Sequence, residues 1–320
     1  MAPRFSILLP THNRSELLRL AIMSALAQSE RDFELLIVGD GCTDNSAAVV
    51  ASFDDPRIRW LDLPKAPHFG YANRNIALRE ASGEYIALIA DDDLLLPDHL
   101  ALLAATLERS GAEWAYSRPL WITADGIVVP FSSNLRNIDE LEFFLSEHNH
   151  IPASCVMYRR RCLDKYGYWP EDVASAADWR YWKRIIEGGN RTNLDCCPTP
   201  TALHFHASWK TIEKGQLGQV TAARDLALRS SWWPAGLKVP IAPGVAEQTV
   251  FFPIIADQAR TDGLRRDVTA VIDRLAWLHL NTLSQTDALQ KQLDAIHDST
   301  AWRLTAPVRG VLNALRRTGG

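Results

Sequence analysis

Short apolar runs alternate with amphipathic segments through the first third of the chain. Four runs are rich in aliphatic and β-branched residues and have the length of strands, at 5–10, 33–39, 58–63 and 85–90. Between them, apolar residues recur at helical spacing and predict helices over 15–28, 43–53 and 71–83. This alternation predicts an α/β fold with a mostly parallel central sheet of the Rossmann type, which binds nucleotides. In such sheets, ligands lie beyond the carboxyl ends of the strands.

The pattern changes along the rest of the chain. A helix is expected over 97–111, with Pro97 near its first turn, and another over 178–189. Beyond about residue 216 the alternation fades, and the chain becomes helical and increasingly polar. We therefore expect a main domain, a linker and a helical tail, over 1–233, 234–263 and 264–320. The main domain should consist of two halves, over about 1–115 and 116–233.

Composition limits the class of protein. The 320 residues are 47% hydrophobic, which suits a sizeable core, and the net charge of −4 gives no reason to expect a nucleic-acid partner. The five cysteines lack metal-ligand spacing, which predicts a reduced, cytoplasmic protein. No signal peptide is evident, and no run reaches the roughly 18–20 apolar residues of a membrane span. We expect a soluble protein, at most attached to the inner face of the plasma membrane.

Three adjacent carboxylates, Asp91, Asp92 and Asp93, follow the fourth apolar run. Adjacent carboxylates repel one another unless a cation neutralises them, so this position is a candidate site for a divalent metal. Mg²⁺ and Mn²⁺ fit best, because they are bound by a few carboxylates together with substrate phosphate oxygens. In an extended segment Asp91 and Asp93 share a face, whereas a turn would change that pairing. The alternative is a solvated loop in which one of the acids caps the next helix.

Four motifs in register extend this hypothesis: "FSILLPTHNR" (5–14), "LIVGDGCTDNS" (36–46), "GYANRNIALREASG" (70–83) and "EYIALIADDDLLLP" (84–97). Together they resemble the nucleotide-sugar domain of the family 2 inverting glycosyltransferases. The resemblance covers roughly residues 5–210 and implies a GT-A-like nucleotide-binding domain with a mostly parallel sheet, followed here by a helical C-terminal extension.

The resemblance also implies roles for single residues in the donor half. The residues expected around the nucleotide are Pro10, Thr11, Asn13, Arg14, Asp40, Arg74 and Asp91. Asp40 matches the acid that contacts uracil or ribose, and Asp92 matches the main metal ligand, with Asp91 beside it. Asp93 is expected as a further metal ligand. Two positions depart from the family pattern, because Gly39 and Ala90 stand where many members have acids. The alternatives are a turn acid at Asp40 and a solvated arginine at Arg74.

Two later segments complete the implied site. A carboxylate at a helix start can deprotonate an acceptor hydroxyl, and Asp178 in "SAADWRYWKRIIEGG" (175–189) matches the family's catalytic base. Its usual acidic neighbour is replaced by Ala177, and Asp178 is also a plausible helix cap. In "LHFHASWK" (203–210), one of two alternating histidines could face the metal or the diphosphate. We favour His206 over His204, with a buried, hydrogen-bonded histidine as the alternative.

The C-terminal tail has a separate pattern. Apolar residues recur at broadly helical spacing over 268–296, and the segment 299–317 contains four arginines and no acid. A basic amphipathic helix of this kind is a plausible membrane-surface anchor, and the segment resembles a tail of many bacterial polysaccharide-assembly glycosyltransferases. A dimer contact or a helix that docks a partner is equally compatible.

These features together predict a metal-dependent, inverting glycosyltransferase of bacterial surface polysaccharide synthesis. Its donor would be a nucleotide-diphosphate sugar, by resemblance a UDP-sugar, its cofactor Mn²⁺ or Mg²⁺, and its acceptor a glycan or a lipid-linked glycan. A sugar nucleotidyltransferase is one alternative, although "PTHNRSELL" (10–18) lacks the Gly-rich basic loop of that class. The other is a non-catalytic binding protein, suggested by the acids missing at Gly39, Ala90 and Ala177.

Overall fold

The computed structural model describes residues 2–131, 133–205 and 214–298. The strands are β1 (Phe5–Thr11), β2 (Phe33–Asp40), β3 (Ile58–Leu63), β4 (Tyr85–Leu88), β5 (Leu94–Leu95), β6 (Trp114–Ser117), β7 (Leu120–Ile122), β8 (Val128–Pro130), β9 (Val156–Arg159), β10 (Leu194–Cys197) and β11 (Ala202–Phe205). The helices are α1 (Ser15–Leu26), α2 (Ser46–Ala51), α3 (Tyr71–Glu80), α4 (His99–Ser110), α5 (Ile138–Ser146), η1 (Ala153–Cys155), α6 (Arg161–Tyr166), α7 (Ala177–Gly188), α8 (Lys214–Arg229), η2 (Ala235–Leu237), α9 (Glu247–Ile255) and α10 (Gln258–Asp298).

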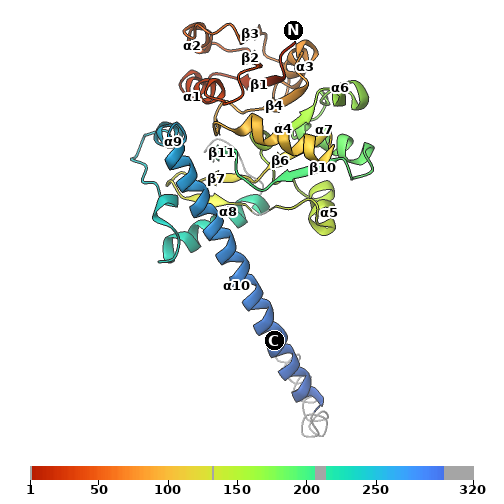
Figure 1. The fold of residues 1–320 in the computed structure, drawn as a ribbon, viewed down its shortest axis with the longest axis vertical. Helices are drawn as coiled ribbons and strands as arrows, with labels where there is room; N and C mark the ends of the chain where they lie inside the picture. Colours follow the sequence, from red (N-terminus) through yellow and green to blue (C-terminus); the bar gives the residue numbers. More distant parts are fainter. Residues whose placement is uncertain (1, 132, 206–213, 299–320) are drawn as a thin grey trace, which may run out of the picture. The chain divides into compact units, whose positions relative to one another are not determined.

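The predicted α/β fold is confirmed (Figure 1). The main sheet has seven strands in the order β10-β6-β9-β4-β1-β2-β3, and all its pairings are parallel except those of β9 with β4 and β6. The four predicted strands and the helices between them are present, with ends that differ by a few residues. Buried aliphatic side chains on β1, β2 and β4 form the centre of the core, as expected for strands covered by helices on both faces.

Strand register brings three loops together at one edge of the main sheet. Thr11 at the end of β1 pairs with Gly39 near the end of β2, and Leu8 pairs with Leu88 at the end of β4. The loops after β1, β2 and β4 therefore begin side by side. This edge is where a parallel sheet binds its ligands.

A second sheet was not predicted from the sequence. It has four strands in the order β5-β11-β7-β8, and its first member directly follows the three carboxylates. Its strands have two to four residues, too short for a clear alternation of apolar and polar positions. The pairing of β5 with β11 links the carboxylate loop to residues 202–205, more than a hundred positions later.

The chain divides into two compact units, Met1–Val268 and Thr269–Gly320. The first unit therefore includes the segment 234–263, for which we expected a linker, and this segment contains η2 and α9. Helix α9 packs against α1.

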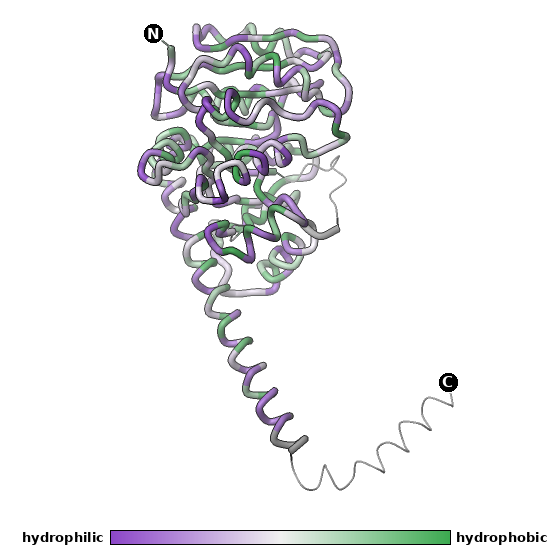
Figure 2. The backbone as a smooth tube through the Cα atoms, turned by 90° about the vertical axis from the view of Figure 1, so that its right-hand side faces the viewer, coloured by the Kyte–Doolittle hydropathy of each residue, from purple (hydrophilic) through white to green (hydrophobic). Residues whose placement is uncertain are grey.

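In the second unit, the described residues continue α10, along which hydrophobic and hydrophilic positions alternate (Figure 2). Its large apolar side chains with high exposure are Trp277, Leu280, Leu283 and Leu289. No helix among the described residues is both long enough and apolar enough to cross a membrane. The basic amphipathic segment 299–317 lies outside the described residues, so its membrane or dimer contact stays a prediction.

Candidate functional site

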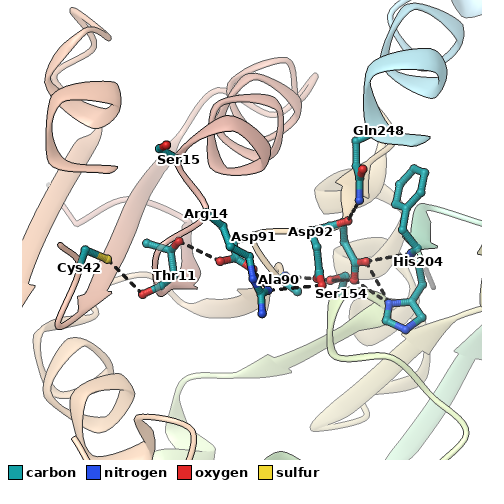
Figure 3. A network of polar contacts seen from close by, with 12 residues as sticks. Thr11, Arg14, Ser15, Cys42, Ala90, Asp91, Asp92, Ser154, His204 and Gln248 are labelled. Carbon is teal, nitrogen blue, oxygen red and sulfur yellow. Dashed lines mark hydrogen bonds and ion pairs between the residues drawn. The ribbon is translucent and has the colours of Figure 1, made fainter. Parts of the chain in front are cut away.

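Asp91 and Asp92 converge on one cationic group. Arg14 Nη1 lies 2.7 Å from Asp91 Oδ1 and 3.4 Å from Asp92 Oδ2 (Figure 3). Thr11 Oγ1 donates a hydrogen bond of 2.8 Å to Asp91 Oδ2. The side chains of both acids are almost completely buried. The last residue of β1 thus supplies a hydroxyl, and the loop after β1 a guanidinium, to the loop after β4.

The pKa of the Asp91 carboxyl is raised to about 6, chiefly by burial; the Arg14 charge lowers it, and the neighbouring Asp92 carboxylate raises it. Keeping both carboxylates ionised therefore costs free energy in the folded chain, and an added positive charge would reduce that cost. A carboxyl with a raised pKa beside a second buried acid is typical of functional sites.

Asp93 makes hydrogen bonds to other parts of the chain than Asp91 and Asp92 do. Its carboxylate accepts hydrogen bonds from Ser154 Oγ at 2.5 Å and from the Phe205 main-chain N–H at 3.2 Å. His204 Nδ1 lies 2.9 Å from Asp93 Oδ2. Asp93 thus holds the carboxylate loop against η1 and β11. His206 lies outside the described residues, so its predicted metal role stays a prediction, as does that of Asp93.

Asp40 lies at the end of β2, and three groups hold its carboxylate. Oδ1 accepts hydrogen bonds from Asn73 Nδ2 at 2.7 Å and from the Ala66 main-chain N–H at 2.9 Å. Oδ2 accepts a hydrogen bond from Lys65 Nζ, whose side chain is 45% exposed. A base that contacts Asp40 Oδ2 would replace this exposed lysine. Gly70 leaves the necessary room, because a Cβ there would lie 2.5 Å from Asp40 Oδ2.

The other two residues predicted around the base, Pro10 and Asn13, lie in β1 and in the loop after it. Pro10 is part of β1 and pairs with Val38 of β2. Asn13 has a φ of 54°, a left-handed conformation that asparagine tolerates better than most residues. Its Oδ1 accepts hydrogen bonds from the main-chain N–H groups of Thr43 at 2.7 Å and Asp44 at 3.2 Å. Asn13 therefore fixes the position of the loop after β2.

Arg74 lies on α3, near enough to Asp178, Asp40 and Asp91 for their charges to act on it. Its guanidinium stacks over the rings of Tyr71, at 5.3 Å, and Trp169, at 5.7 Å. Burial lowers the pKa of this guanidinium, and the charges of Asp178, Asp40 and Asp91 oppose that effect. The side chain makes no hydrogen bond or ion pair within the described chain, and its Nε is buried without a partner.

Asp178 lies in the first turn of α7, and its Oδ1 accepts a hydrogen bond of 2.8 Å from the Trp179 main-chain N–H. The helix cap is Ala176, not Asp178, with a φ of 56° that is strained for alanine. Such strain is frequent at functional sites. The Asp178 charge also raises the pKa of Tyr71, after the larger effect of burial. Asp178 therefore lies near α3, the helix that presents Arg74.

The structure explains the departures from the family pattern at Gly39 and Ala177, whereas at Ala90 it shows a main-chain hydrogen bond that an acidic residue could also make. A Cβ at Gly39 would lie 2.3 Å from Trp60 Cη2, so the tryptophan ring fills the space of an acid. The main-chain N–H of Ala90 donates a hydrogen bond of 2.9 Å to Ser154 Oγ, the hydroxyl that also bonds Asp93. Ala177 is completely buried, where an acidic side chain would lack solvent.

The carboxylate pair fits a small divalent cation. Both acids already reach one positive atom, Arg14 Nη1, so they can share a cation. Within the described residues, no group of three or more histidine, cysteine or acidic side chains is placed to hold a metal ion. Mg²⁺ and Mn²⁺ commonly accept two protein carboxylates and take their remaining ligands from water and substrate phosphates.

Sequence reasoning missed Gln248 altogether. Its Nε2 donates a hydrogen bond of 2.8 Å to the main-chain oxygen of Asp92, although the two residues are 156 positions apart (Figure 3). Gln248 belongs to the expected linker, and no local pattern connects it with the acids. Lys65, Asn73 and Ser154 were also missed, since each is an ordinary polar residue in its own segment.

A comparison with protein-family models identifies the family. The model described as glycosyl transferase family 2 matches residues 6–167, which include the loops after β1, β2 and β4. The chain belongs to glycosyl transferase family 2. The resemblance noted in the sequence is thereby confirmed, and the fold of this glycosyltransferase is of the GT-A type.

Two of the curated relatives are a bacterial glycosyltransferase and a bacterial polysaccharide-synthesis protein. This glycosyltransferase is 25% identical over 197 residues to the UDP-Glc:alpha-D-GlcNAc-diphosphoundecaprenol beta-1,3-glucosyltransferase WfgD of Escherichia coli, covering 60% of this chain and 73% of WfgD. It is 30% identical over 229 residues to the succinoglycan biosynthesis protein ExoO of Rhizobium meliloti, covering 68% of this chain and 63% of ExoO. Slightly less than two thirds of ExoO is therefore spanned.

Solved structures support the fold. The structure of residues 1–349 of S. aureus TarS in complex with UDP-GlcNAc superposes with a TM-score of 0.54 at 18% identity. The match covers 71% of this chain and 67% of that one.

Proposed function

We propose that this glycosyltransferase moves a sugar from a nucleotide-diphosphate donor, preferably a UDP-sugar, to a hydroxyl of a glycan or lipid-linked acceptor, with inversion at the anomeric carbon. The Arg74 guanidinium carries the proposal. It is half-buried, makes no ion pair within the described chain, and lies among Asp40, Asp91 and Asp178. A cation in such a place suits an anionic ligand, and a diphosphate between base-contacting and catalytic acids has the required charge.

In the proposed reaction, Asp178 accepts the proton of the acceptor hydroxyl. The acceptor oxygen forms a bond to the anomeric carbon as the bond from that carbon to the diphosphate oxygen breaks, so the configuration inverts. Arg74 binds the departing nucleoside diphosphate. Asp91 and Asp92 would hold Mg²⁺ or Mn²⁺, which when bound neutralises charge on the leaving group.

The preference for uridine and for a lipid-linked acceptor draws support from the relatives. The E. coli relative is named as an enzyme that uses UDP-Glc and a diphosphoundecaprenol-linked acceptor. Asp40 also has the chemistry that suits uracil, because a carboxylate accepts the hydrogen bond that the ring N3–H donates. A role in bacterial surface polysaccharide synthesis, at the inner face of the plasma membrane, is part of the proposal.

The test is product identity. The full chain would be incubated with UDP-glucose, UDP-galactose or UDP-GlcNAc, Mn²⁺ or Mg²⁺, and a synthetic polyprenyl-diphosphate-linked GlcNAc. We expect UDP release in step with a glycosylated lipid, and an inverted anomeric configuration by NMR. Pyrophosphate release would indicate a nucleotidyltransferase instead. Binding of a UDP-sugar without release of UDP would indicate a non-catalytic binding protein.

A further inference from the structure

Helix α9 brings a glutamine to the carboxylate pair. Gln248 lies in the first turn of α9, and its side chain points toward the loop that contains Asp92 (Figure 3). Its Nε2 donates a hydrogen bond of 2.8 Å to the Asp92 main-chain oxygen. Only 4% of Gln248 is exposed. Helix α9 packs against α1, which follows Arg14, so the glutamine approaches from the side that supplies the guanidinium.

The other half of the same amide is unsatisfied. Gln248 Oε1 is buried and has no hydrogen-bond partner among the described residues. An unpaired buried acceptor costs free energy, and this cost offsets what the Nε2 hydrogen bond contributes. An apolar side chain of the same size would therefore stabilise the fold about equally well. A buried polar group that adds little stability requires another explanation, and proximity to the site offers one.

A second buried glutamine provides the comparison. Gln28 is fully buried, and its Nε2 donates hydrogen bonds to the main-chain oxygens of Ser24, at 3.3 Å, and Leu96, at 2.8 Å. Its Oε1 accepts a hydrogen bond of 3.1 Å from the Leu100 main-chain N–H. Both halves of this amide are used, as expected for a glutamine that serves stability alone.

We propose that Gln248 is a positioning residue, which holds the main chain at Asp92 and so sets the direction of the Asp92 carboxylate. The carbonyl group that Gln248 binds and the side chain of Asp92 are attached to the same Cα, so a shift of the main chain at Asp92 moves both. Without the hydrogen bond, Asp92 can turn away from the point it shares with Asp91. This inference rests on the proposed function of the carboxylate pair. A displacement of about 1 Å at such a site can reduce turnover about 100-fold.

The test compares Gln248→Met with Gln28→Met in the full chain. Three quantities would be measured: the melting temperature, the affinity for UDP in the presence of Mn²⁺, and kcat with the donor and acceptor that the wild-type chain uses. For Gln248→Met we expect a melting temperature within a few degrees of wild type, a UDP affinity in Mn²⁺ at least threefold weaker, and a kcat at least tenfold lower. For Gln28→Met we expect a clearly lower melting temperature, with UDP affinity and kcat of the folded protein unchanged.

Two results would overturn the positioning role. One is a Gln248→Met variant with wild-type UDP affinity and kcat. The other is a melting temperature reduced as far as in Gln28→Met, which would make the amide an ordinary structural group. If the wild-type chain transfers no sugar, the proposed function fails, and UDP affinity in Mn²⁺ then still decides whether Gln248 positions Asp92.

Discussion

Arg14 Nη1 donates a hydrogen bond of 2.7 Å to Asp91 Oδ1, so the ligand-free site contains its own positive charge. The same nitrogen lies 3.4 Å from Asp92 Oδ2. A guanidinium and a divalent cation are alternatives at this point, because both neutralise the two buried acids. The Arg14 guanidinium therefore neutralises part of the charge of the pair, and we expect metal binding to depend on Arg14.

Replacing Arg14 should lower the stability of the protein, and added metal should restore part of that stability. We expect Arg14→Met to lower the free energy of unfolding by about 2 kcal/mol, since two adjacent buried carboxylates lose their partner. Thermal unfolding with and without MnCl₂ measures the effect, and Mn²⁺ should raise the melting temperature more for Arg14→Met than for the parent. Arg19→Met is the control, because Arg19 is exposed on the following helix. If Mn²⁺ raised the melting temperature equally in the parent and in Arg14→Met, the guanidinium and the metal would not share a position between the two acids.

Gly70 should be necessary for the geometry of Asp40. Gly70 and Gly111 both have φ near +70°, but a Cβ at Gly70 would meet the Asp40 carboxylate, whereas nothing lies within 4 Å of a Cβ at Gly111. Alanine at either position adds backbone strain of about 1 kcal/mol. We expect Gly70→Ala to weaken UDP binding at least tenfold by calorimetry and Gly111→Ala to leave it unchanged. Equal affinities in the two variants would show that Asp40 does not contact the base.

Arg74 should contribute more to donor binding than to stability. We expect Arg74→Met to weaken UDP binding by about 1.5–3 kcal/mol, the range for hydrogen bonds to charged groups. The free energy of unfolding should fall by only about 1 kcal/mol, from the lost stacking on Tyr71 and Trp169. Arg79→Met, on the exposed side of the same helix, should change UDP affinity less than twofold. Calorimetry and urea unfolding measure the two quantities. A large loss of stability with unchanged UDP affinity would mean that Arg74 has a structural role and does not bind the donor.

Stability should fall in mild acid because of His99. This side chain is completely buried with Nδ1 2.8 Å from Thr201 Oγ1, and burial lowers its pKa to about 4. In the unfolded chain the imidazole titrates near 6.5. As the pH falls from about 6.5 to 4, the unfolded chain binds a proton that the folded chain does not, so stability is lost in that window.

Urea unfolding at pH 7 and pH 5 checks this sign. Between these values the free energy of unfolding should fall by about 2 kcal/mol more in the parent than in His99→Asn, which lacks the titrating ring. The same decrease in both proteins would mean that His99 does not titrate with a lowered pKa.

The sequence was informative where chemistry follows local pattern. Apolar runs separated by helical spacing predicted β1 to β4, because a parallel sheet buries its strands on both faces. The consecutive acids after β4 marked the edge of the sheet where the loops meet. Thr11 and Arg14, both predicted to lie around the nucleotide, do contact Asp91, because strand order brings their segment beside the carboxylates.

Contacts between distant segments could not be predicted from local sequence patterns. Gln248 reaches Asp92 because α9 folds back onto α1, and nothing in its own segment encodes that approach. Asp93 resembled its two neighbours in sequence, yet its hydrogen bonds to Ser154 and to β11 depend on a short second sheet without a visible pattern. The replacement of an acid by Gly39 is explained only by the ring of Trp60, which comes from the adjacent strand.

The central claim is that Asp178 is the base of a sugar transfer, and Asp178→Asn tests it most directly. Parent and variant would be compared for UDP affinity and for the rate of UDP release with a donor and an acceptor that the parent uses. We expect nearly unchanged UDP affinity and a rate at least 100-fold lower, because asparagine cannot accept the hydroxyl proton. Transfer at the parent rate by Asp178→Asn would contradict the account.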